Sequence, residues 1–238
     1  CIIGLNYEAL PAAVAVPLTV IAAMVFGGLW SAVAGFLRAK FRISEIYVTV
    51  MLNYVMTYFA SFLLTNVWKS QLNLDYSDQI FTNSHWPALL SGTDLHLGFV
   101  FLVLAFLVVV FINRSPMGYE IRAHGLNSSA FRFKMKDHDS MRIVMFVMIF
   151  SGALAGLAGA SQVCGHQYRF SSDVNNDFGF TGIIAAKLGG LNPVAIVVAS
   201  LFLGMMESGS TAMQLLTGVP DSMVDVLQGM LLVAAILA

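Results

Sequence analysis

Long runs of apolar residues fill most of this chain, and short polar stretches separate them. Within each run the apolar side chains follow one another without the apolar–polar alternation that the strands of a membrane barrel show. A helix needs roughly 20 apolar residues to cross the roughly 30 Å hydrocarbon core of a bilayer. The pattern therefore predicts membrane-spanning helices within residues 9–37, 46–67, 97–113, 143–165, 188–206 and 222–238.

Basic residues concentrate on every second connection between these predicted helices. If the spans alternate in direction, ten of the twelve lysines and arginines lie on one side: Arg38, Lys40, Arg42, Arg114, Arg122, Arg132, Lys134, Lys136, Arg142 and Lys187. The opposite side holds Lys69, Arg169 and most of the acidic residues. Since positively charged loops remain in the cytoplasm, the basic side is predicted to be cytoplasmic and the first span to begin outside.

The same alternation requires a short apolar piece, residues 178–186, to cross back toward the cytoplasm. This piece is short for a full span, so we expect a short or re-entrant helix whose ends are shielded by protein. The sequence thus predicts an all-α integral membrane protein, a polytopic bundle of about seven membrane segments that forms one transmembrane domain over residues 1–238. Because the chain has neither an initiator methionine nor a polar tail, we expect a truncated chain that lacks earlier spans.

The composition agrees with this pattern and removes several other classes. Hydrophobic residues make up 58% of the chain and charged residues 11%, whereas a soluble domain is about one-quarter charged. A net charge of −1 does not fit a nucleic-acid binder, which needs a basic face. The two cysteines give no disulfide framework, and the five histidines show no metal-ligand spacing. Composition therefore favours the lipid bilayer as the surroundings and predicts neither a metal site nor a nucleic-acid partner.

Small residues recur at helical spacing in two of the predicted spans. Residues 151–161 read SGALAGLAGAS, and an earlier span places Gly27, Ser31 and Gly35 four residues apart. In lipid, faces of small residues let two helix backbones approach closely. Such faces serve either static packing or helices that line and reshape a pathway, and both interpretations require a bundle of several helices.

The polar stretch over residues 113–142 carries the most informative pattern. Asn127 or Ser128 is suited to cap a short helix that begins near Ser129. This helix would present the aromatic ring of Phe133 within a basic rim. An exposed helix of this kind suits docking into a groove of a cytoplasmic partner, although a basic loop that touches only lipid headgroups has the same composition.

A motif in this stretch resembles a known family. The sequence GYEIRAHGLN follows the pattern Gly-x-x-Ile-Arg-Ala-x-Gly-x-Asn of permease subunits of ABC importers of the branched-chain amino acid, ribose and nucleoside type. The resemblance is greatest to the simple-sugar and nucleoside permeases. Four further pieces resemble the family in order and spacing: residues 44–55, 151–160, 179–204 and 218–233. The resemblance therefore covers essentially the whole chain.

The resemblance implies the role of this cytoplasmic loop and the partners of the chain. In such importers the loop over residues 113–142 is a coupling segment that sits in a cleft of a separate ATPase subunit, and the permease itself catalyses no reaction. No Walker A motif occurs in this chain, so ATP is expected on that partner and no cofactor on this subunit. The expected partners are the ATPase, a second permease subunit (the same or a paralogue) and an extracytoplasmic solute-binding protein, at a bacterial-type cytoplasmic (inner) membrane. The coupling residues implied by position are Glu120, Arg122, His124, Asn127, Ala130, Arg132 and Phe133.

The expected function is alternating-access transport of a small polar solute, a simple sugar or a nucleoside. Polar groups within the spans are candidates for its pathway: Asn53, Tyr54, Gln162 and Glu207. Because an isolated carboxylate at membrane depth is costly, Glu207 either faces the pathway or pairs locally with a helix end or a serine hydroxyl at an internal interface. The alternative function is an ion-coupled secondary transporter that uses Glu207 as its proton carrier. Trp68 and Trp86 are expected in the interfacial aromatic belt.

Overall fold

The computed structural model describes residues 11–41, 43–68, 76–87, 89, 95–126, 137–171, 178–220 and 222–237. Within these ranges the chain is helical apart from turns, irregular connections and isolated bridge residues, among them the antiparallel pair Tyr76 and Ser171. This agrees with the predicted all-α fold. The described chain divides into two compact units, residues 1–174 and residues 175–238, and the single transmembrane domain over residues 1–238 stays a prediction.

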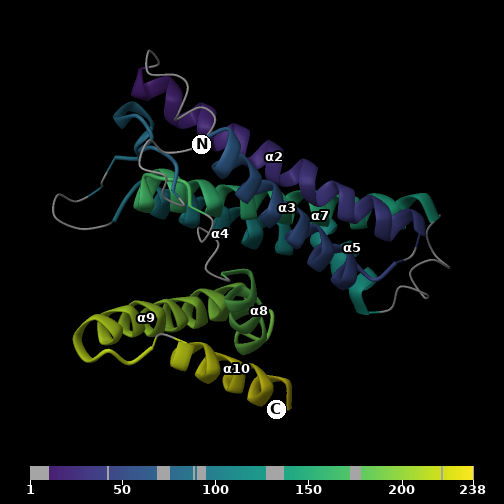
Figure 1. Ribbon diagram of the computed structural model, residues 1–238. Helices are drawn as coiled ribbons and strands as arrows, with labels where there is room; N and C mark the ends of the chain where they lie inside the picture. Colours follow the sequence, from purple (N-terminus) through teal and green to yellow (C-terminus); the bar gives the residue numbers. More distant parts are fainter. Residues whose placement is uncertain are drawn as a thin grey trace. The chain divides into compact units, whose positions relative to one another are not determined.

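The first unit contains the longer series of helices (Figure 1). Its elements are α2 (Ala12–Phe41), α3 (Glu45–Asn66), the 3-10 turn η1 (Thr82–Ser84), α4 (Gly98–Arg114), α5 (Pro116–Leu126), α7 (Asp137–Ser161) and the π-helical turn η2 (Gln162–Gln167). The second unit consists of α8 (Phe178–Leu188), α9 (Pro193–Thr217) and α10 (Ser222–Leu237).

Each of the seven predicted membrane segments is a helix in the structure. In the described part of the chain, four helices are long and apolar enough to cross a membrane: α2, α3, α7 continued by η2, and α9. The pair α4 and α5 makes a fifth if its two parts are counted as one span, and α8 and α10 are shorter apolar helices. The short helix expected at residues 178–186 is therefore confirmed as α8. The chain is a multi-pass membrane protein.

The boundary between the fifth and sixth segments differs from the expected one. The span predicted over residues 188–206 begins at Pro193 and continues to Thr217. A turn precedes it, with Gly190 and Leu191 at positive φ, and the Asn192 side chain accepts a hydrogen bond from the Val194 N–H at 3.1 Å. An asparagine N-cap followed by proline at the first helical position is a strong helix start, and it moves the helix toward the C-terminus.

Helices α2 and α7 run side by side and pack through their glycine faces (Figure 1). A Cβ atom at Gly27 would collide with the Gly152 carbonyl oxygen, and one at Gly156 would collide with the Ala23 carbonyl oxygen. The Ser31 hydroxyl donates across this contact to the Met148 carbonyl oxygen at 2.7 Å. The two small-residue faces predicted separately from the sequence thus pack against each other, which confirms the predicted close approach of helices.

The segment around Trp86 folds back over the end of α7. Trp86 is only 1% exposed and belongs to a core cluster with Ile80, Val163 and Cys164. Its backbone N–H donates to the Cys164 carbonyl oxygen at 2.9 Å. The prediction that Trp86 belongs to the interfacial belt is therefore wrong, because contacts between residues distant in sequence bury the ring.

Candidate functional site

Helices α4 and α5 form a sharp corner at the start of the stretch predicted to be cytoplasmic. The two helices are bent by 75°, and Ser115 between them is extended, with φ −84° and ψ 164°. The Ser115 hydroxyl donates to the Ile112 carbonyl oxygen at 2.7 Å and accepts from the Gly118 N–H at 3.3 Å. Ser115 therefore caps α5, and Pro116 takes the first helical position, which needs no donor.

Gly118 allows the two helices to meet at this angle. It is buried, and a Cβ atom there would collide with the Ile112 carbonyl oxygen and the Asn113 backbone. These obstacles are main-chain atoms of the preceding helix, so a change of side-chain rotamer cannot relieve the collision. A residue larger than glycine would force α5 away from α4.

Arg122 links α5 back to the end of α4. Its Nη1 donates to the Asn113 carbonyl oxygen at 2.9 Å. This carbonyl lies at the C-terminal end of α4, where carbonyl groups lack helical partners and a positive charge is favourable. The structure thus gives Arg122 a contact within its own chain: it holds the angle of the corner that the cap and Gly118 define.

The other predicted coupling residues fall into two groups. Glu120 and His124 lie on α5 and are half-buried. The remaining four lie outside the described residues, as does the short helix expected near Ser129: Asn127, Ala130, Arg132 and Phe133. The cytoplasmic coupling loop over residues 113–142 stays a prediction; its part up to Leu126 is helical apart from Ser115. The Ser-Pro pair at positions 115 and 116 is a helix-start signal that could have revealed α5.

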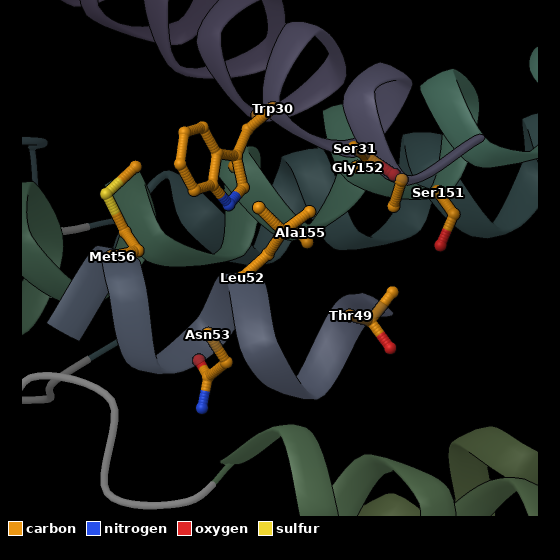
Figure 2. A pocket seen from close by; sticks show the side chains of 12 residues that line it. Trp30, Ser31, Thr49, Leu52, Asn53, Met56, Ser151, Gly152 and Ala155 are labelled. Atoms are coloured by element: carbon orange, nitrogen blue, oxygen red, sulfur yellow. The ribbon is translucent and has the colours of Figure 1, made fainter. Parts of the chain in front are cut away.

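A cavity of about 340 Å³ lies between α2, α3 and α7 in the first unit (Figure 2). Asn53 and Trp30 are among its lining residues, and the backbone of Gly152 and Gly156 forms part of its wall. Of the four predicted pathway residues, Asn53 lines this cavity. Tyr54 is not among the lining residues, and its side chain is 60% exposed.

Glu207 belongs to a polar chain in the second unit. The Thr181 hydroxyl donates to the Gln228 Oε1 at 3.3 Å, and the Gln228 Nε2 donates to the Glu207 Oε2 at 3.2 Å. Gln228 lies on α10 and is only 4% exposed. Its buried side chain links Thr181 of α8 to Glu207 of α9. Glu207 thus has a local partner, the Gln228 amide, and its place on the solute pathway stays a prediction. Gln162 begins the π-helical turn η2 in the first unit.

The described ranges hold no candidate metal site. No group of three or more histidine, cysteine, aspartate or glutamate side chains is placed there to hold a metal ion.

Comparison with known proteins gives one family and several relatives. The family described as "Branched-chain amino acid transport system / permease component" matches residues 2–236. The guanosine ABC transporter permease protein NupP of Bacillus subtilis is 34% identical over 221 residues, which cover 91% of this chain and 63% of that protein. The nucleoside ABC transporter permease protein NupB of Lactococcus lactis is 30% identical over 234 residues, 94% of this chain and 64% of that protein.

A third relative comes from an archaeon. The glucose ABC transporter permease protein TsgB13 of Haloferax volcanii is 28% identical over 236 residues, which cover 94% of this chain and 61% of that protein. The chain therefore spans less than two thirds of the length of each of these three relatives. No solved structure matches the chain significantly.

Proposed function

Because the chain belongs to the family of branched-chain amino acid transport system permease components, we propose that it is the membrane permease subunit of an ATP-driven ABC importer. The observation that carries this proposal is the family match, which extends over residues 2–236 and so includes both units and the α4–α5 corner. In this role the subunit forms the path for the solute and catalyses no reaction. ATP is hydrolysed on a separate subunit.

The proposed assembly has three protein partners besides the bilayer. A cytoplasmic ATPase binds the coupling segment, a second permease subunit (a copy or a paralogue) completes the pathway, and an extracytoplasmic binding protein delivers the solute. The bacterial cytoplasmic membrane is the proposed location. The ten basic residues on the predicted inner side support this orientation.

The proposed solute is small and polar, either a nucleoside or a simple sugar. The printed names of the relatives support this range, since two refer to guanosine or nucleosides and one to glucose. The proposed mechanism is alternating access, in which ATP binding by the partner moves the coupling segment and the permease changes the side to which its pathway opens.

The α4–α5 corner gives this mechanism a physical basis. The Ser115 cap, the close approach at Gly118 and the Arg122 contact fix α5 against the end of α4. When the segment that follows α5 is displaced, α5 and α4 are therefore expected to move together. The family match disfavours ion-coupled transport through Glu207, and the bond from Gln228 gives that carboxylate a structural partner.

The proposal predicts that the full-length permease, purified in detergent, retains an ATPase subunit. We expect Phe133→Ala to reduce the retained ATPase, because this ring lies in the proposed coupling segment. Phe99→Ala is the matched control. Phe99 is an exposed ring in the first turn of α4, at the end of this helix that is far from the coupling segment. Quantifying the ATPase in each purified sample checks this. A wild-type sample without an ATPase, even when ATP is trapped, would refute the proposal.

A further inference from the structure

We propose that one side of α3 lines the solute pathway that this subunit shares with the second permease subunit. The inference rests on the proposed function, in which two permease subunits enclose the pathway. It assigns the side chains of this chain that the solute meets on its way across the membrane. Its evidence is the way in which exposed polar and exposed apolar side chains are divided around α3.

Packing within the first unit leaves most of α3 uncovered. The helix packs against α2, and Leu64 is the residue of α3 that becomes buried. A few other side chains are half-buried: Val48, Leu52, Ala60, Ser61 and Leu63. The rest of the described side chains of this helix are exposed. What surrounds α3 in the membrane therefore follows from the chemistry of these exposed side chains.

One exposed stripe of α3 carries hydroxyl groups. Successive residues of a helix point about 100° apart, so positions four, seven and eleven residues apart share a side. Residues with this spacing form what we call the hydroxyl stripe: Tyr54, Tyr58, Ser61 and Thr65. Toward the start of α3 the same side carries Val50, so the stripe belongs to the part of the helix after Asn53.

The adjoining exposed stripe of the same helix is apolar. Met51, Val55, Phe59 and Phe62 follow a similar spacing, and all of these side chains are exposed. Helix α4 shows such a surface in a purer form, because its exposed residues before Arg114 are all apolar: Phe99, Val100, Leu102, Val103, Leu104, Leu107, Val108 and Phe111. Surfaces of this composition suit contact with lipid chains. Helix α3 thus presents one side suited to lipid and another that is not.

The phenol groups of the stripe decide against lipid on that side. The Ser61 and Thr65 hydroxyls donate to carbonyl oxygens of their own helix, at 3.0 and 2.9 Å, and hydroxyls bonded in this way tolerate lipid. No hydrogen bond to the Tyr54 or Tyr58 hydroxyl is found among the described residues. The same holds for the amide of Asn53, which lies between the stripe and α2. These groups require water or a polar ligand, because covering them with lipid is unfavourable.

Tyr54 and Tyr58 also lie too deep for the interfacial aromatic belt. At 1.5 Å per residue they are about 14 and 20 Å along a helix of about 33 Å. Tyrosines of the belt lie at the ends of a span, where the phenol reaches the headgroups. Polar groups near the middle of a membrane face the inside of a bundle or a water-filled path. The exposure of Tyr58, 74%, therefore points to a path outside its own unit.

The stripe offers neutral hydrogen-bonding groups and aromatic rings. A tyrosine hydroxyl both donates and accepts a hydrogen bond, and after Glu45 the helix contains no acidic or basic residue. Nucleosides and simple sugars share an uncharged ring that carries several hydroxyl groups. Side chains of this kind bind such a ring without ion pairing, so the stripe suits both classes of the proposed solute.

Cysteine labelling compares the two sides of α3 directly. The full-length permease, with its native cysteines replaced, is assembled with its partner subunits in proteoliposomes. Tyr54→Cys and Tyr58→Cys are expected to react with a charged, water-soluble methanethiosulfonate added on both sides of the membrane. Val55→Cys and Phe59→Cys, the adjacent residues on the apolar side, are the matched controls. We expect the controls to react at least about tenfold more slowly, because the thiolate is the reactive form and lipid disfavours it.

Solute protection separates the pathway from any other wet surface. With the binding protein present, an excess of guanosine or of glucose is expected to slow the labelling of Tyr58→Cys. The solute that protects identifies which of the two classes meets the stripe. Protection by neither solute would overturn the inference.

Removing the hydroxyl groups measures their contribution to transport. Tyr54→Phe combined with Tyr58→Phe keeps both rings and is expected to lower ATP-driven uptake of the protecting solute about tenfold, the effect of about one hydrogen bond. Phe59→Leu, on the apolar side, is expected to stay within about twofold of wild type. The amount of ATPase subunit that co-purifies with each variant reports whether the complex has folded and assembled.

Two labelling results would overturn the inference. One is equal labelling of the two sides of α3, and the other is no labelling of the hydroxyl stripe because another part of the assembly covers it. Uptake at the wild-type rate by the double phenylalanine variant would also overturn it. In each case ATP-driven uptake by the wild-type complex would leave the proposed function intact, whereas its absence would refute that function itself.

Discussion

Replacing Gly118 by alanine is expected to uncouple the permease from its ATPase. The added Cβ atom would collide with the Ile112 carbonyl oxygen and the Asn113 backbone, so α5 would have to swing away from the end of α4. Overpacking of this kind typically costs about 1–3 kcal/mol. The contact between Arg122 and the Asn113 carbonyl oxygen would open at the same time. The segment after α5 would then no longer move together with α4.

The measurement is solute uptake per ATP hydrolysed in proteoliposomes that contain the complete complex. We expect Gly118→Ala to lower this ratio by about tenfold, the effect of about 1.4 kcal/mol. Gly159→Ala, outside the coupling segment, is the control, because a Cβ atom there meets nothing within 4 Å, and alanine favours a helix by about 1 kcal/mol over glycine. If the two variants couple transport equally well, the corner does not transmit the movement.

Gly156→Ala is expected to lower the free energy of unfolding of the permease. Its Cβ atom would collide with the Ala23 carbonyl oxygen across the contact of α2 with α7. A main-chain oxygen can be avoided only by separating the helices, and separation would also weaken the Ser31 bond to the Met148 carbonyl oxygen. A free-energy loss of about 1–3 kcal/mol is the scale of such overpacking.

Thermal unfolding of the purified permease in detergent measures this loss as a lower midpoint. Gly159→Ala is the matched control on the same helix, since a Cβ atom there meets nothing within 4 Å. We expect the control to unfold at the wild-type temperature or slightly above it. Equal midpoints for Gly156→Ala and Gly159→Ala would show that the glycine contact does not hold the two helices together.

The apolar pattern was sufficient to predict the helices, because the length of a span is set by the bilayer and each span must satisfy its own backbone. The faces of Gly27 and Gly152 were visible for the same reason, since spacing within one helix is local. The spacing of small residues within one helix does not show which other helix that face contacts. The contact between these two faces was therefore not predictable from the spacing. The burial of Trp86 likewise depends on its contact with the distant Cys164.

The candidate site was predictable only in part. Asn53 and Tyr54 were equal candidates as neighbouring polar residues, yet successive positions on a helix point about 100° apart, and the packing of α2 and α7 selected Asn53 for the cavity. Trp30 gave no signal of its own, because an aromatic residue in a span is ordinary. Gln228 was one of several membrane glutamines, and its role emerged from the approach of α9 to α10.

ATP-driven uptake tests the central claim most directly. The full-length permease is reconstituted with its ATPase and binding protein, and labelled guanosine is supplied outside. We predict uptake that requires both ATP and the ATPase and that persists when a protonophore collapses the pH gradient. Uptake without ATP that is driven by a pH gradient and abolished by Glu207→Gln would contradict the account.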